Sequence, residues 1–250
     1  MFENVRITRT GGRFDQCYAL LSEELGPEVL EPKKSLEEKL MAQSLPGAEQ
    51  NYVMIGRFGS ASDSVDPLAA VVSGEYMPLV NRPGSGMGAV GQAVTHQALR
   101  GKGHGTSALV LFEAAIAAAA AARGEKLQMM ILESKSQARN YWYQRGYCYP
   151  LGTEYWQPPV DYDKETGKPL YPAMPELLMV NVYGAANATS IDRSLLIDAV
   201  RTLYHVWYMP DQIPVAARPE VEQNIQALFE RFLESLPPDD SPVPLSAPPT

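Results

Sequence analysis

The feature that most constrains this chain is a glycine-rich turn, Arg100-Gly101-Lys102-Gly103-His104-Gly105. Residues 87–98 before it combine Gly, Ala, Val, Gln and Thr without a helical period, which predicts a strand. Residues 106–123 after it predict an alanine-rich helix. Glycines let successive N–H groups converge on an anion, and a helix N-terminus adds a partial positive charge. The turn therefore predicts a pyrophosphate site, and a glycine turn without a ligand is the alternative.

The spacing within the turn excludes two common phosphate-binding motifs. A P-loop needs Gly-Lys followed by Ser or Thr, whereas Lys102 lies between two glycines. The dinucleotide motif Gly-x-Gly-x-x-Gly is absent, because the three glycines of the turn strictly alternate with other residues. The remaining pattern, Arg-x-x-Gly-x-Gly, resembles motif A of the GNAT superfamily of acyl-CoA N-acyltransferases.

A second resemblance lies after the predicted helix. Residues 127–133 predict a buried strand, and residues 136–147 predict a short helix that ends at Gly146. This stretch resembles motif B of the same superfamily, in which Asn-x-x-Ala is followed by a tyrosine and then by Gly-Phe. Two positions depart from that motif, since Lys135 replaces the frequent asparagine and Trp142 replaces the frequent general-acid tyrosine.

The predicted elements fit the fold that this resemblance implies. Their order is strand, two helices, three strands, helix, strand, helix and two strands, which predicts an α/β fold with helices on both faces of the sheet. The resemblance implies that the sheet is mixed and mostly antiparallel, as in a GNAT-like fold. Besides the segments already named, the expected helices are 14–25 and 35–45, and the expected strands are 4–8, 52–58, 68–77, 147–156 and 176–183.

Three regions are expected along the 250 residues. Residues 1–185 would form the GNAT acyltransferase domain. Residues 186–236 predict a C-terminal helical extension, whose two amphipathic helices must pack on the core, form a dimer contact or cover the site. Residues 237–250 are rich in proline and predict a disordered tail.

The resemblance implies acetyl-CoA, or another acyl-CoA, as the cosubstrate. In the superfamily the turn's amides hold the pyrophosphate, and the preceding strand runs beside pantetheine. In this chain that strand would contribute Ala93, Val94 and Thr95, with N–H groups near Val94 and Thr95 stabilising the oxyanion. Lys135 would pair with a phosphate or face solvent. The residues expected at the pyrophosphate are Arg100, Gly101, Lys102, Gly103, His104, Gly105 and Thr106.

The implied reaction is direct acyl transfer from the thioester to a primary amine. A covalent intermediate is disfavoured, because neither Cys17 nor Cys148 lies in a pattern that would pair it with a histidine, and no Gly-x-Ser-x-Gly motif occurs. Direct attack requires a base for the amine, a donor for the oxyanion and a proton or positive dipole for the leaving thiolate.

The base and the acid are predicted less directly. Many relatives carry a glutamate on the strand before the turn, but residues 87–93 contain no carboxylate. Glu75 and Glu133 are the available substitutes, with a water chain as the alternative and a salt-bridged or solvated carboxylate as their ordinary role. Tyr143 is the candidate acid, and its neighbour Tyr141 is expected in the core.

Charge and composition limit the partners. The net charge is −8, and the basic residues form no stripe, which argues against nucleic acid. Two cysteines and three scattered histidines predict no metal site. No run reaches membrane-spanning length and no signal peptide is evident, so a cytoplasmic protein without a membrane partner is expected.

The acceptor is expected to be a small-molecule or peptide amine. The aromatic residues between positions 141 and 162 favour apolar site walls, although core packing also explains them. The insert at 157–175 would be an acceptor lid or a disordered loop. A homodimer is possible. Two other functions remain open: a non-catalytic acyl-CoA sensor, and an interaction protein that uses the C-terminal helices.

Overall fold

The computed structural model describes residues 1–43, 45, 51–59, 67–163, 165–166, 168–185, 187–209 and 218–247. Contacts divide the chain into two compact units. Unit 1 comprises Met1–Tyr76 with Val90–Gly124, and unit 2 comprises Met77–Ala89 with Glu125–Thr250. Residues 60–66, between the strands expected at 52–58 and 68–77, and residues 210–217 lie outside the described residues.

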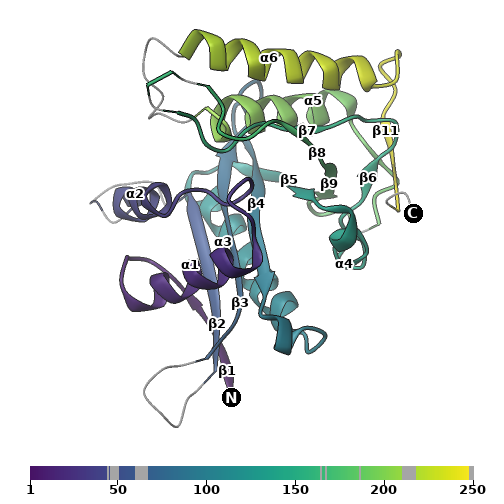
Figure 1. The fold of residues 1–250 in the computed structure, drawn as a ribbon. Helices are drawn as coiled ribbons and strands as arrows, with labels where there is room; N and C mark the ends of the chain where they lie inside the picture. The colour runs from purple at the N-terminus through teal and green to yellow at the C-terminus, as the bar shows by residue number, and fades with distance from the viewer. Residues whose placement is uncertain are drawn as a thin grey trace. The chain divides into compact units, whose positions relative to one another are not determined.

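The expected mixed α/β architecture is confirmed (Figure 1). Hydrogen bonding gives a six-stranded sheet in the order β1-β2-β3-β4-β5-β9. The pairs β1–β2, β2–β3 and β5–β9 are antiparallel, and β3 and β4 each have residues in both units. The strands are β1 (Phe2–Arg6), β2 (Tyr52–Gly59), β3 (Leu68–Pro78), β4 (Ser85–Thr95), β5 (Lys126–Ser134) and β9 (Leu177–Val182).

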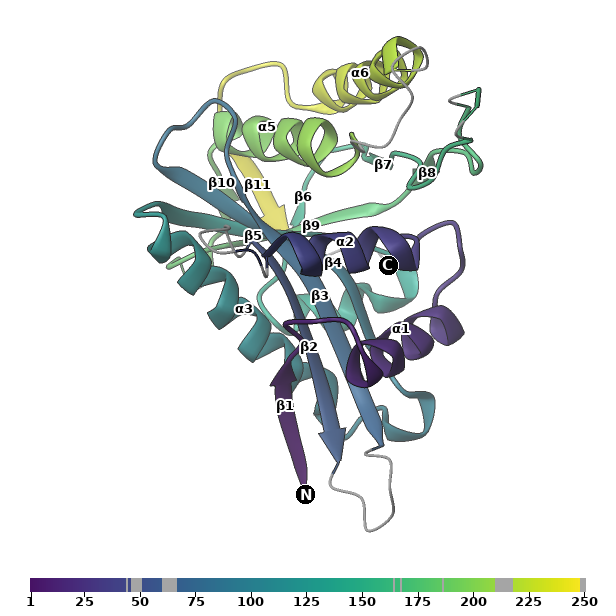
Figure 2. The ribbon, with the colours of Figure 1, turned by 90° about the vertical axis from the view of Figure 1, so that its left-hand side faces the viewer.

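In unit 1, helices cover both faces of the strands (Figure 2). Helices α1 (Gly12–Glu24) and α2 (Lys33–Gln43) pack on the face formed by alternate residues of β2. The approach is close, because a Cβ on Gly56 would lie 3.0 Å from the Cys17 sulfur. Helix α3 (His104–Ala122) contacts β1 and β2. The core residues on the α1 and α2 side include Phe14, Cys17, Leu21, Leu36, Leu40, Tyr52, Met54 and Phe58.

Helix α3 is longer and more apolar than the sequence analysis allowed. Its 19 residues include a window of mean hydropathy 1.7, so by length and composition alone it could cross a membrane. The expectation that no run reaches this length was therefore wrong. Its buried residues lie along one face, and Asn4 of β1 donates hydrogen bonds to Ser107 near its start. A third of the apolar window is buried within the structure.

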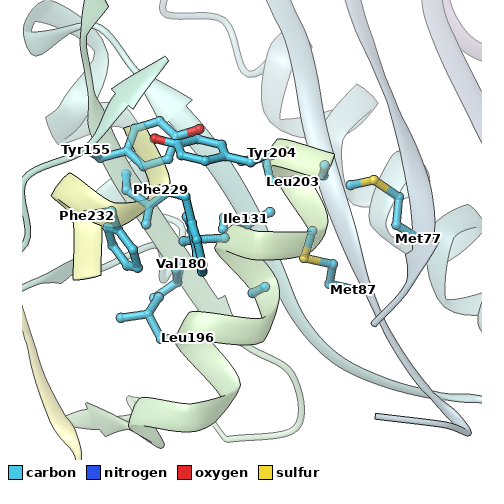
Figure 3. Close-up of a cluster of buried hydrophobic side chains, with 14 of the residues drawn as sticks. Met77, Met87, Ile131, Tyr155, Val180, Leu196, Leu203, Tyr204, Phe229 and Phe232 are labelled. Carbon is cyan, nitrogen blue, oxygen red and sulfur yellow. The ribbon is translucent and has the colours of Figure 1, made fainter. Parts of the chain in front are cut away.

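In unit 2, the C-terminal helices share one core with the strands. Helix α5 (Arg193–Thr202) continues as a π-helical turn, η3 (Leu203–Trp207), and lies beside α6 (Arg218–Ser235) (Figure 1). Core packing is thus the observed arrangement among the three expected for these helices. The predicted boundary at 185 does not coincide with the edge of a compact unit, because apolar faces on both sides of it meet in this core. Members shown in Figure 3 include Ile131, Val180, Leu196, Leu203, Tyr204, Phe229 and Phe232.

The region predicted as a disordered tail contains a strand. β11 (Val243–Ser246) pairs with β10 (Ser190–Ile191) and with β6 (Tyr149–Pro150). The Val243 side chain is 0% exposed, whereas Pro244 is exposed. Proline-rich composition suggested disorder, but one buried valine and two partner strands order the described residues. Residues 248–250 lie outside the described part of the chain.

The strand expected at 147–156 is interrupted. It consists of the short strands β6 and β7 (Trp156–Gln157) and an isolated antiparallel bridge between Cys148 and Val180, and helix α4 (Arg139–Tyr143) precedes it. Pro150 has no N–H for a ladder, and Gly152 has φ 79°, so the chain turns between the two segments. The two ends of the insert at 157–175 pair with each other as β7 and β8 (Met174–Pro175), which favours an ordered base for this insert. Its role as an acceptor lid stays a prediction.

We expect Val243→Ala to destabilise the protein, because it removes fully buried methyl groups from the core of unit 2. The loss should be about 1–3 kcal/mol, measured by urea denaturation. Pro244→Ala, at the exposed neighbouring position, is the matched control and should change stability little. Equal stability of the two variants would contradict the packing of β11.

Candidate functional site

The predicted pyrophosphate turn is open and is held in a conformation that glycine favours. Gly101 and Gly103 have φ values of 76° and 81°, and an added Cβ on either would meet nothing within 4 Å. Gly103 is the N-cap of α3 and supplies no side-chain cap, while its carbonyl accepts the Ser107 N–H at 3.0 Å. Gly105 is buried in the first helical turn. The arrangement leaves backbone N–H groups accessible where an anion would bind.

The two basic residues of the turn lie across the end of β4. The Arg100 Nε donates to the Thr95 carbonyl at 3.2 Å, and its guanidinium also pairs with Glu24 of α1. Lys102 Nζ donates to the Ala98 carbonyl at 3.3 Å. Both side chains remain exposed. The charge expected for a pyrophosphate is present, but Glu24 offsets part of it.

His104 has a structural environment that its position in the turn did not predict. Its ring packs on Phe2 at 4.3 Å between centroids, and its Nδ1 accepts the Arg57 Nε at 3.2 Å. Desolvation, Arg57 and Lys102 lower the pKa of His104, which favours the neutral imidazole. Arg57 also donates to Asn4, which in turn holds Ser107. The cluster fixes the start of α3 to β1 and β2 and gives His104 no positive charge for a phosphate.

The other predicted coenzyme residues lie in three places. Ala93, Val94 and Thr95 end β4, with Val94 in the core of unit 1 and the other two partly exposed. Thr106 is partly buried in the first turn of α3. Lys135 belongs to unit 2, directly after β5.

Glu75 lies in an ion-pair cluster of unit 1. Its carboxylate is 2.5 Å from the Lys39 ammonium, which is also 2.9 Å from Glu31. Burial would lower the pKa of Lys39, but the two carboxylates outweigh it and raise that pKa. Tyr52 is the cross-strand partner of Glu75. A base in this position would have to give up a partly buried ion pair before it could accept a proton.

Glu133, the other candidate base, lies at the end of β5 in unit 2 between two phenols. Tyr155 donates to its Oε1, and Tyr208 donates to its Oε2. Burial raises the pKa of Glu133 to about 7, the two phenol hydrogen bonds oppose this rise, and Glu176 adds to it. A carboxyl group with a pKa near neutrality can accept and release a proton under ordinary conditions.

A third tyrosine holds this arrangement in place. Tyr204 donates to the Trp156 carbonyl at 2.6 Å, and its ring lies 5.4 Å from that of Tyr155 (Figure 3). Tyr208 follows the π-helical turn, and its N–H donates to the Leu203 carbonyl at 3.2 Å. The sequence analysis missed Tyr208 as a partner of Glu133, because nothing local in the sequence links two residues 75 positions apart.

The predicted acid, Tyr143, is not one of the tyrosines on Glu133. Its side chain is 44% exposed on α4. Trp142 is buried instead and packs edge-on against Tyr141 and Tyr147. The structure therefore brings Glu133 together with Tyr155 and Tyr208. Across the described ranges, no group of three His, Cys, Asp or Glu side chains could hold a metal ion.

We expect Glu133→Gln to stabilise the protein more at high pH than at low pH. The folded-state pKa of Glu133 is above its ordinary value, so the folded protein binds more protons than the unfolded chain between about pH 4.5 and 7. Wild-type stability from this group is therefore lost as pH rises through that window, whereas glutamine does not titrate. The stability of Glu133→Gln relative to wild type should rise by at most about 3 kcal/mol from pH 5 to pH 8. Urea denaturation at the two pH values measures this difference.

Glu234→Gln, on the exposed side of α6, is the control for removing one negative charge. A Glu133→Gln effect that does not change with pH, or one that Glu234→Gln reproduces, would contradict the burial of the Glu133 carboxylate.

No protein-family model and no curated protein matches this sequence. Solved structures do match the fold. Arabidopsis thaliana NAA60, solved in complex with acetyl-CoA, aligns with a TM-score of 0.50 at 6% identity over 74% of this chain and 100% of its own.

Two further solved structures align below that score. A protein from Bacteroides thetaiotaomicron assigned to the GNAT family as an acetyltransferase gives 0.48 at 19% identity, over 78% of this chain and 92% of its own. An aminoglycoside 6'-N-acetyltransferase complexed with coenzyme A has a TM-score of 0.45 at 13% identity. The alignment covers 72% of this chain and 96% of its own. The mixed sheet, its flanking helices and the alignment over all of the Arabidopsis protein agree: this chain has a GNAT-like fold.

Proposed function

We propose that this protein is an acyl-CoA N-acyltransferase that transfers an acyl group, acetyl being the simplest, to a primary amine. The observation that carries the proposal is the Glu133 carboxyl group, which is partly buried, accepts hydrogen bonds from two phenols and has its pKa raised to about 7 by desolvation. Most surface carboxylates are fully ionised at neutral pH and are weak bases, so burial gives Glu133 the basicity that deprotonation of an ammonium group requires.

In the proposed reaction, Glu133 accepts a proton from the acceptor ammonium group. The free amine nitrogen then forms a bond to the thioester carbonyl carbon, and the carbon–sulfur bond breaks to release the coenzyme thiolate. The thiolate takes up one proton, and the amide nitrogen loses its second. N–H groups near Val94 and Thr95 remain the proposed donors to the developing oxyanion.

The glycine turn fits the pyrophosphate of an acyl-CoA. Gly101 and Gly103 have left-handed φ values and open space above their Cα atoms, so a phosphate can approach the backbone without meeting a side chain. The start of α3 adds the positive end of its dipole. Arg100 and Lys102 are exposed and sit at the same turn, and Arg100 can exchange Glu24 for a phosphate oxygen. These observations support the turn as the coenzyme site.

The acceptor is proposed as a small-molecule or peptide amine of the cytoplasm. An amine fits this proposal, because a base such as Glu133 is needed when the nucleophile is protonated in water.

Replacing Gly103 by valine should abolish coenzyme A binding in calorimetry, because a β-branched side chain covers the turn and strains the left-handed φ. Gly124→Val is the matched control. Gly124 lies at the other end of α3, has φ 69° and has equally open surroundings. It should cost comparable stability and leave coenzyme binding unchanged, and equal loss of binding in both variants would refute the turn as the site.

Glu133→Gln should lower kcat for thiol release from acetyl-CoA by about 10²–10³-fold, which is the usual contribution of general base catalysis. Binding of coenzyme A should remain. Glu75→Gln should instead lower the melting temperature, because it leaves the Lys39 ammonium with fewer partners, and should keep the shape of the pH–rate profile. If Glu133→Gln retains wild-type turnover, Glu133 is not the base.

A thiol-release assay with a panel of amines also separates the alternatives. Turnover supports the transferase. Coenzyme binding without turnover by the wild type would identify an acyl-CoA sensor, and neither binding nor turnover would favour an interaction protein.

A further inference from the structure

We infer that Tyr155 and Tyr208 are positioning residues for Glu133, and that the C-terminal segment beyond residue 185 is therefore part of the catalytic site. Their phenol groups orient the carboxylate and favour its ionised form. The inference rests on the proposed function, because it assigns a role within the same site. It extends that proposal by making α5 and η3, which the sequence suggests as an appendage, necessary for the base to work.

The two hydrogen bonds fix the orientation of the carboxylate. Tyr155 donates to Oε1 and Tyr208 donates to Oε2, so both oxygens are held and rotation about the last side-chain bond is restrained. An ionised carboxylate offers about four lone-pair positions. The two phenols occupy two of these positions, and the remaining lone pairs can accept a proton from the acceptor amine. A carboxylate held in this way needs no reorganisation when the amine arrives.

Each phenol is itself held by the surrounding chain. The Tyr155 carbonyl accepts the Glu176 N–H at 3.2 Å, and its ring packs against Tyr204. Tyr208 is 4% exposed and directly follows the π-helical turn η3, whose i→i+5 hydrogen bond runs from Tyr208 to Leu203. Such turns widen a helix locally and occur frequently at functional sites.

The electrostatic balance at Glu133 depends on these phenols. Burial favours the neutral acid, and Glu176 favours it further, whereas the bonds from Tyr155 and Tyr208 favour the carboxylate. Burial, followed by the charge of Glu133, raises the pKa of both tyrosines, so they stay protonated as donors. Tyr204 also interacts electrostatically with Glu133, but its hydroxyl donates to the Trp156 carbonyl. Without the two donors, Glu133 would remain protonated at neutral pH and could not serve as a base.

The test compares Tyr208→Phe with Tyr204→Phe in the full-length protein. Both changes remove one buried phenol oxygen and keep the ring, but only Tyr208 donates to Glu133. The pKa of Glu133 is read directly by carbon-13 NMR of its carboxyl group, assigned with Glu133→Gln. Because a hydrogen bond to a charged group contributes about 1.5 kcal/mol or more, Tyr208→Phe should raise this pKa by about one unit. Tyr204→Phe should leave it unchanged.

The pH–rate profile gives the second readout. With Tyr208→Phe the acidic limb of kcat/KM should move up by the same unit, which lowers the rate at pH 7 by about fivefold and restores it near pH 9. Tyr155→Phe removes the donor to the other carboxylate oxygen and should raise the pKa of Glu133 and shift the pH–rate profile in the same way. This second variant keeps the test available if Tyr208→Phe folds poorly. A merely structural phenol would lower stability without moving either pKa.

The outcomes separate this inference from the proposed function. If Tyr208→Phe and Tyr155→Phe both leave the Glu133 pKa unchanged, or if Tyr204→Phe shifts it equally, the positioning role is refuted, whatever the enzyme's activity. If the wild-type protein turns over no amine but the carboxyl pKa shifts as expected, the proposed function fails while the hold of the two phenols on the carboxylate stands.

Discussion

The central constraint in unit 2 is a carboxyl group withdrawn from water. Glu133 ends a strand whose other inward residues are apolar, and an ionised side chain there is costly unless donors surround it. Tyr155 and Tyr208 provide those donors from segments that are 22 and 75 residues away in sequence. The result is a compromise between burial, which favours the acid, and hydrogen bonding, which favours the carboxylate. That compromise yields a group able to exchange protons near neutrality.

Unit 1 contains a second, independent feature, the glycine turn at the start of α3. Its backbone is open because two glycines adopt left-handed φ values, while nearby side chains hold the turn from beneath. Arg57 links His104 to Asn4, and Asn4 is bonded to Ser107. These contacts anchor the helix N-terminus. A rigid helix end with accessible N–H groups is a suitable site for phosphate, and this reasoning needs no charge on His104.

Much of the architecture could be predicted from local patterns. The helical period of residues 14–25 and 106–123 and the apolar runs at 52–58 and 127–133 gave elements that the structure confirms within a few residues. The strand expected at 147–156 failed because Pro150 and Gly152 turn the chain. The tail from Pro237 was expected to be disordered, because composition does not report that Val243 fills a buried position between two partner strands.

By itself, the sequence determined the glycine turn, the strand and helix that flank it, and two candidate glutamates, since these depend on residue type and short-range spacing. Only the tertiary structure shows how the surroundings of the two glutamates differ. Glu75 meets the Lys39 ammonium in an ion pair, whereas Glu133 accepts hydrogen bonds from two phenols in a partly buried position. The reason is physical: the basicity of a carboxylate depends on its burial and on the donors around it, and those donors come from distant segments that only folding brings together.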